Sequence, residues 1–346
     1  LTICLLGNLC LLGAYGIINH FVTGSQLVLW SDGYEQYWKD NRASGSYYCP
    51  DHFAGALEMG LALGLGILLD RAKTGRWKLA ASITCLIAVT GIIMSKSRGA
   101  GLTLIVVCVS AMIFGFAQWP SRARWRLRSI LATAMIVILG VLFFFPSLYM
   151  DRFTSYFSVN TKVEQKILPA IFEKVRHTSR GVMISAALRA WEEQPVFGIG
   201  PGMHRNLWPH IAATPDGDRE LGIWPSRTNN RTHSYHVHSD WVQLLQEYGS
   251  VGFMLLLIPV TGGFLLFGMI IHRESKREKI TDSTRRANGY FAASLGGFLA
   301  YIAMLFHSLG DFNLQIPANT WLFAVVLAIP IGFALGRRNP ADSERR

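Results

Sequence analysis

Apolar residues in this chain occur in long blocks separated by short polar stretches. Each block is about as long as a helix that crosses the hydrocarbon core of a bilayer, and its apolar residues do not keep to one helical stripe. The blocks predict eight spans, at residues 1–19, 53–69, 77–94, 100–118, 129–148, 249–271, 288–308 and 318–336. The expected fold class is therefore all-α, a polytopic bundle of membrane helices.

Lys and Arg gather in four connections, at residues 71–78, 122–128, 273–286 and 337–346, and these alternate with the other connections. Since cytoplasmic connections are enriched in basic residues, both chain ends are predicted to lie inside. The segments predicted outside are 20–52, 95–99, 149–248 and 309–317. The chain then divides into N-terminal spans (1–148), a long extracytoplasmic segment with short helices (149–248), and C-terminal spans with a cytoplasmic tail (249–346).

Composition limits the expected partners and covalent cross-links of the chain. The net charge is +11, but more than half of the 33 Lys and Arg residues lie in the four topogenic connections, so nucleic acid is not an expected partner. Four of the five cysteines fall inside spans, which argues against a disulfide framework. The chain opens on Leu1 within an apolar block, without Met or a basic region, so we expect no signal peptide there and leave open whether further spans precede it.

Three histidines, His233, His236 and His238, precede the sixth predicted span. Imidazole transfers protons near neutral pH, so a general base or proton shuttle is one interpretation. A metal site completed by Asp240 is another, although no familiar zinc spacing is present. Structural, hydrogen-bonded histidines are the third.

Arginines are the second candidate group. Arg98 lies in a short outer turn, where its side chain either snorkels to lipid head groups or binds an anion. Arg180 and Arg189 lie nine residues apart in a predicted short helix, which places them on opposite faces, so one helix does not aim both at one phosphate. A solvated surface helix explains either arginine equally well.

Two further polar positions stand out. Glu58 lies within a predicted span, and a carboxylate at this depth normally faces the protein interior and is a weak indication of function. Asp311 and Asn313 lie in a polar turn after the seventh span, where capping is the simplest interpretation.

Several segments taken together resemble the O-antigen ligase and polymerase superfamily, whose members assemble bacterial envelope glycans. These segments are Asp51–Met59, Ser97–Gly99, Arg189 with Trp191, Pro195 and Gly198–Gly200, His238–Gly249 and the closing Asp311–Pro317. Each segment is short and tolerates sequence variation, so the resemblance depends on the order of the segments and on their common side of the membrane.

The resemblance implies an inverting, metal-independent glycosyltransferase of the C type, without a cofactor, that uses a glycan on undecaprenyl diphosphate. It implies that Arg98 and Arg189 bind the diphosphate and that His238 is the catalytic base. His236 is close enough to compete for that role, and Arg180 is a further substrate-binding candidate. The acceptor would be a glycan, a lipid or a protein. The implied location is the bacterial inner membrane, with the active site on the periplasmic side.

We accordingly expect the long outer segment to fold back so that Arg189 and Arg98 approach one cavity. Polymerisation of repeat units is slightly favoured over ligation of a finished chain. A lipid or polysaccharide flippase is the main alternative, although its expected signature of charges at mid-membrane is limited to Glu58. A scaffold for other envelope enzymes is a third possibility.

Overall fold

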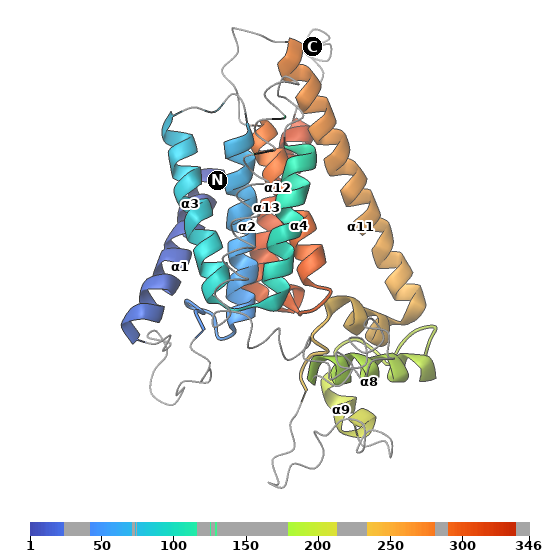
Figure 1. Cartoon of the computed structure of the whole chain (residues 1–346). Helices are drawn as coiled ribbons and strands as arrows, with labels where there is room; N and C mark the ends of the chain where they lie inside the picture. The colour runs from blue at the N-terminus through green and yellow to red at the C-terminus, as the bar shows by residue number, and fades with distance from the viewer. Residues whose placement is uncertain are drawn as a thin grey trace, which may run out of the picture. The chain divides into compact units, whose positions relative to one another are not determined.

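A computed structural model describes residues 1–23, 42–70, 73, 75–115, 125, 129, 179–212, 234–280 and 290–336, and these contain helices and no strand. The helices are α1 (Thr2–Thr23), α2 (Pro50–Leu69), α3 (Gly75–Met94), α4 (Arg98–Phe114), α8 (Ser179–Glu193), α9 (His204–Ala212), α11 (Asp240–Ile280), α12 (Tyr290–His307) and α13 (Pro317–Gly336), with a 3₁₀ turn η1 at Asn313–Gln315 (Figure 1). Seven of the eight predicted spans coincide with α1–α4 and α11–α13. The predicted span 129–148 lies outside the described residues apart from Ser129.

Five of these helices are long and apolar enough to cross a membrane, namely α1, α2, α3, α11 and α12. The apolar parts of α4 and α13 are shorter. The fold is thus that of a polytopic helical membrane protein, as predicted, while the number of spans and their orientation stay predictions. Helix α11 begins at Asp240, ahead of the predicted span that starts at 249, and it contains a break at Gly249 (φ 65°).

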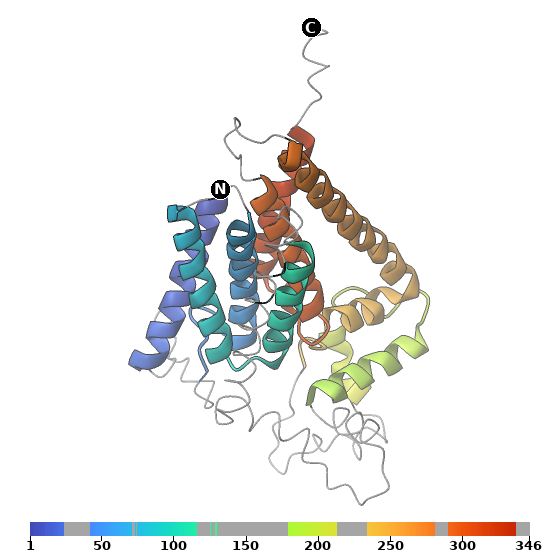
Figure 2. The ribbon, with the colours of Figure 1, turned by 45° about the horizontal axis from the view of Figure 1, so that its top comes forward.

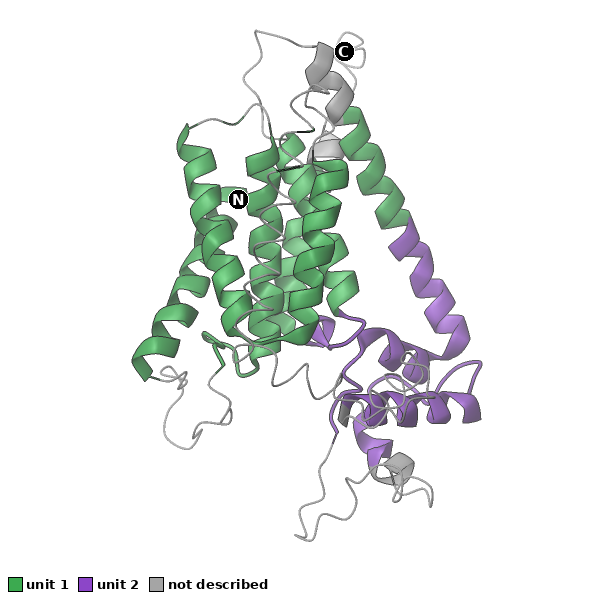
Figure 3. Cartoon of the chain, in the orientation of Figure 1, with its two compact units in different colours: residues 1–141, 262–307, 316–346 green, residues 142–261, 308–315 purple. Residues whose placement is uncertain are grey.

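Contacts divide the chain into two compact units (Figure 3). Unit 1 comprises residues 1–141, 262–307 and 316–346, and unit 2 comprises 142–261 and 308–315. Unit 1 thus combines helices from both ends of the chain. The division of the chain at 148 and 248 remains a prediction based on topology.

Helix α2 forms the core of unit 1. In Figures 1 and 2 it lies between α1 and α3 on one side and α4, α12 and α13 on the other. All its residues except Leu68 are buried, as expected for a helix that is apolar on every face. Small residues allow close packing: a Cβ on Gly60 would lie 3.1 Å from Leu9 of α1, and one on Gly64 would lie 2.5 Å from the sulfur of Cys85 in α3.

The closest approach is between α2 and α12, at Gly66. A Cβ on Gly66 would overlap the carbonyl oxygen of Ala292 and lie 2.7 Å from the backbone nitrogen of Gly296. Because both contacts are with backbone atoms, a side chain here would have to push the two helices apart. We expect Gly66→Val to lower the free energy of unfolding by about 1–3 kcal/mol or more, the usual cost of overpacking.

This prediction is checked by denaturant titration of the purified protein in detergent micelles. Gly268→Val in α11 is the matched control, since a Cβ there meets no atom within 4 Å. Equal stability of the two variants would contradict the proposed backbone contact.

Unit 2 contains α8, α9, the first part of α11 and the segment 308–315. Helix α8 packs through Val182, Ala186, Ala187 and Ala190, all of which are buried. These residues recur three to four positions apart along one face of the helix. Helix α9 packs through Trp208, which is 2% exposed.

Candidate functional site

The break in α11 at Gly249 is closed by the turn that follows α8. Before the break, the carbonyls of Gln246 and Glu247 accept hydrogen bonds from the amides of Ile199 (3.0 Å) and Gly200 (2.9 Å). After the break, the amides of Ser250 and Val251 donate to the carbonyls of Pro195 (2.8 Å) and Val196 (3.1 Å). Backbone groups that would otherwise lack helical partners are thereby satisfied.

Two glycines make this joint possible. Gly198 (φ 72°) and Gly249 (φ 65°) both adopt the left-handed conformation that other residues rarely take. A Cβ on Gly249 would overlap the carbonyl oxygen of Val196 and lie 2.5 Å from the nitrogen of Gly198. Trp191 adds a side-chain clasp, since its Nε1 donates to the carbonyl of Pro195 (3.1 Å) and to Oγ of Ser250 (3.3 Å). The spacing of Trp191, Pro195 and the glycines therefore has a structural explanation.

The first turns of α11 hold residues 234–239, the described part of the segment that contains the histidines. Oε1 of Gln243 accepts the amide of Val237 (3.2 Å), and Nε2 of Gln243 donates to Glu247 (3.2 Å). The Glu247 carboxylate also accepts the amides of Gly202 (2.9 Å) and His204 (3.4 Å), which places a negative charge at the start of α9. Both Gln243 and Glu247 are buried.

A second buried network contains His204, which sequence analysis did not identify. Its Nδ1 lies 2.9 Å from Oε1 of Gln246, and its Nε2 lies 3.1 Å from Oγ of Ser234. The Ser234 hydroxyl in turn donates to the carbonyl of His236 (2.9 Å). The backbone of the histidine segment is thus held from two directions.

His238 is the residue immediately before the cap of α11. Its backbone is in the left-handed region (φ 60°), which is uncommon for a residue other than glycine and is often found at functional sites. Its side chain is 30% exposed, and Nδ1 lies 3.8 Å from Oδ1 of Asp311. Ser239 caps the helix, with Oγ accepting the amide of Val242 (3.4 Å).

Asp311 is 1% exposed and lies between His238 and Arg180. Nη2 of Arg180 lies 3.8 Å from Oδ2 of Asp311, and Nη1 donates to the carbonyl of Gly310 (2.7 Å). The Asp311 carboxylate also accepts the amide of Phe312 (2.8 Å). At 3.8 Å the imidazole and the carboxylate are beyond hydrogen-bond distance, and the arrangement is that of a carboxylate placed beside a candidate base.

Asp240 holds segment 308–315 against α11. Its Oδ2 accepts hydrogen bonds from Oγ of Ser308 (2.8 Å) and from the amide of Leu314 (3.0 Å). Its own amide donates to the carbonyls of Ser308 (3.0 Å) and Asp311 (3.1 Å). Asp240 thus positions Asp311, a role different from the metal ligand considered from the sequence.

The other histidines have different surroundings. His236 stacks on the ring of Phe312, with centroids 4.4 Å apart and planes 21° from parallel, and His238 meets the same ring edge-on at 4.7 Å. His233 lies outside the described residues. Within the described ranges, no group of three His, Cys, Asp or Glu side chains is placed to hold a metal ion.

Arg180 and Arg189 both belong to α8, so helical geometry directs them to opposite faces. Arg180 is engaged with Gly310 and Asp311. Arg189 is partly buried. These contacts link Arg180 to the surroundings of His238.

In unit 1, Arg98 is the first residue of α4. Ser97 caps this helix by accepting the amide of Ala100 (3.3 Å), so partly buried Arg98 adds its charge to the positive end of a helix. Anions bind favourably at such an end. The next residue, Gly99, lies against His307, because a Cβ on Gly99 would be 3.2 Å from the imidazole.

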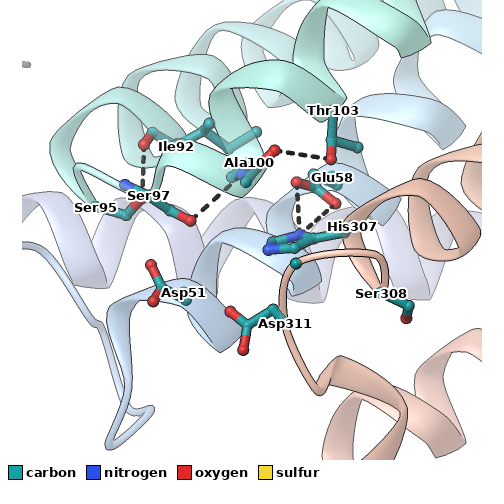
Figure 4. A network of polar contacts seen from close by, with 12 residues as sticks. Asp51, Glu58, Ile92, Ser95, Ser97, Ala100, Thr103, His307, Ser308 and Asp311 are labelled. Atoms are coloured by element: carbon teal, nitrogen blue, oxygen red, sulfur yellow. Dashed lines mark hydrogen bonds and ion pairs between the residues drawn. The ribbon is translucent and has the colours of Figure 1, made fainter. Parts of the chain in front are cut away.

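His307 pairs with Glu58 inside unit 1 (Figure 4). Its Nδ1 lies 2.9 Å and 3.0 Å from the two carboxylate oxygens, and both side chains are 1% exposed. Glu58 therefore faces the protein interior, as expected from the sequence. Its partner was not predicted, since His307 is 249 residues away.

A buried arginine that sequence analysis overlooked lies at the same end of unit 1. Arg42 forms an ion pair with Asp51 at the start of α2, and its Nε donates to the carbonyl of Ser95 after α3 (2.6 Å). It thus joins the ends of two helices.

Asn319 at the start of α13 joins the same end of unit 1. It donates to the carbonyl of His52 (2.9 Å) and accepts from the Tyr47 hydroxyl (2.7 Å). Burial raises the pKa of Tyr47 to about 12, so this phenol remains a donor.

Arg98 belongs to unit 1 and Arg189 to unit 2. Their approach to one diphosphate therefore stays a prediction, as do the roles of His238 and Arg180.

Comparison with known proteins adds the family. No curated protein matches the chain. The sequence model of the O-antigen ligase family matches residues 83–257, which is half of the chain. The matched region contains Arg98, Arg180, Arg189 and His238, whereas Glu58 and Asp311 lie beyond it. The chain belongs to the O-antigen ligase family.

Proposed function

We propose that this protein transfers a glycan from undecaprenyl diphosphate to an acceptor hydroxyl at the outer face of the bacterial cytoplasmic membrane. The observation that carries the proposal is the pairing of His238 with buried Asp311 at the start of α11, in a chain of the O-antigen ligase family. A histidine next to a carboxylate is the usual arrangement of a general base.

In the proposed reaction, His238 takes the proton of the acceptor hydroxyl while the hydroxyl oxygen attacks the anomeric carbon of the donor. The bond between that carbon and the diphosphate oxygen breaks, and undecaprenyl diphosphate leaves from the opposite face, so the configuration inverts. Asp311 holds the imidazole and stabilises its positive charge once the proton has moved.

The leaving group gathers negative charge as the bond breaks. Arg98 and Arg189 are proposed to bind it, because guanidinium groups stabilise a diphosphate without a metal ion. For Arg98, the support is its position at the N-terminus of α4. Arg180 is proposed to orient Asp311 and, through its 30% exposed side chain, to contribute to substrate binding.

Polymerisation and ligation share the same donor, and we favour polymerisation slightly. The glycan made by a deletion strain separates the two reactions. Single repeat units on the lipid acceptor would indicate a polymerase, whereas unattached full-length polymer would indicate a ligase.

A flippase would move the lipid-linked glycan without breaking a glycosidic bond, so the test is product formation. Purified protein with a synthetic undecaprenyl-diphosphate oligosaccharide and an acceptor should form a longer or newly linked glycan, and it should do so in excess EDTA. Translocation without product would favour the flippase. Loss of product under chelation, restored by zinc or manganese, would show that a metal takes part.

A further inference from the structure

The turn that closes the break in α11 has an apolar tip. Val196 is 51% exposed and Phe197 is 75% exposed, so two adjacent large apolar side chains face outward. The residues just before the tip are polar, Glu192, Glu193 and Gln194, and all three are exposed. The chain therefore changes from charged to apolar within a few residues.

The tip is bonded to the first turn of a membrane helix. Ser250 and Val251 donate to the carbonyls of Pro195 and Val196, and after this point α11 is strongly apolar. Its exposed side chains include Val251 (43%) and Met254 (62%). The exposed apolar surface of α11 thus continues onto the tip, and Ser250, the polar residue at the junction, is bonded to Pro195 and Trp191.

Two aromatic residues, Trp191 and Tyr248, lie near the break at Gly249. Trp191 donates its indole N–H to Pro195 and Ser250, and Tyr248, just before the break, is 43% exposed. Trp and Tyr concentrate where a membrane protein passes from lipid to water, because one end of each side chain is apolar and the other polar. Their position near Gly249 is that expected of aromatic residues at a membrane boundary.

We propose that Val196 and Phe197 insert into the outer leaflet of the bilayer and anchor unit 2 at the membrane surface. These two side chains contact bilayer lipid, because they continue the exposed apolar surface of α11. Since the joint at Gly249 is made of backbone hydrogen bonds, the depth of the tip also sets the depth of the first turns of α11. Those turns hold the segment that carries His238.

The test uses a fluorophore whose emission depends on polarity, attached at Phe197→Cys in a protein whose five native cysteines are replaced by alanine. The protein is placed in nanodiscs of phosphatidylcholine and phosphatidylglycerol. Asn206→Cys on exposed α9 is the matched control, and Val196→Cys provides a second labelled tip position if the first variant folds poorly.

The label at 197 should emit at shorter wavelength than the label at 206. It should lose most of its fluorescence when the lipids carry bromine near the upper end of their acyl chains, and it should resist aqueous iodide. The label at 206 should behave in the opposite way. Quenching of both labels by iodide alone would overturn the proposal. Protection of 197 from iodide without quenching by brominated lipid would also overturn it, because protein would then cover the tip.

Discussion

Replacing His238 with alanine should lower the turnover of glycan transfer by about two to four decades while donor affinity changes little. The imidazole accepts a proton only as the new bond forms, so its loss affects the transition state and not the bound donor. The measurement uses purified protein and a synthetic undecaprenyl-diphosphate oligosaccharide, with donor affinity and product formation determined separately.

Two comparisons sharpen this prediction. Arg189→Ala should weaken both donor binding and turnover, because the diphosphate is charged in the ground and transition states, and Arg189→Lys should restore activity only in part. His236→Ala should retain most of the activity. An inactive His236→Ala protein beside a normal His238→Ala protein would place the base two residues earlier, and normal turnover in both would refute histidine catalysis.

Removal of one partner of the Glu58–His307 pair should cause the largest loss of stability. Both side chains are 1% exposed, so Glu58→Ala or His307→Ala leaves the other group buried without this hydrogen-bonding partner. Breaking a buried pair in this way typically costs about 3–5 kcal/mol. The free energy of unfolding, from denaturant titration in micelles, should fall by that order.

The double variant Glu58→Leu with His307→Leu is the informative control. Replacement of a whole buried pair by apolar residues is often nearly neutral, so the double variant should be more stable than either single variant. Additive losses in the double variant would show that the two residues act independently. Glu192→Ala, at an exposed position of α8, should change stability little.

The helices of the membrane region were predictable because their apolar blocks are long and nearly free of charge. The break within α11 was not predictable, because it is a backbone rotation at Gly249 between the amphipathic part, Asp240–Tyr248, and the apolar part of the helix. The glycine in the sequence gave no indication that it would close against Gly198, since that contact depends on a turn far away in the chain.

The candidate site was predictable to a similar extent. His238 and the arginines stood out as polar residues near predicted membrane boundaries. The partners of these residues did not, because Arg180 and Gly310 are 130 residues apart, and periodicity contains no information about such pairs. Asp311 was interpreted as a cap, yet it is buried beside His238, and Arg42 was overlooked because its burial depends on Asp51 and Ser95.

The joint at Gly249 also constrains the order in which the chain assembles. Trp191 leaves the ribosome 59 residues before Ser250, which accepts its indole hydrogen bond. The amides of Ile199 and Gly200 likewise form their hydrogen bonds only after Gln246 and Glu247 have been synthesised. Unit 2 therefore completes its fold only after the first membrane turns of α11 have been synthesised. A fragment that ended before Gly249 would lack Ser250 and Val251, whose amides donate to the carbonyls of Pro195 and Val196.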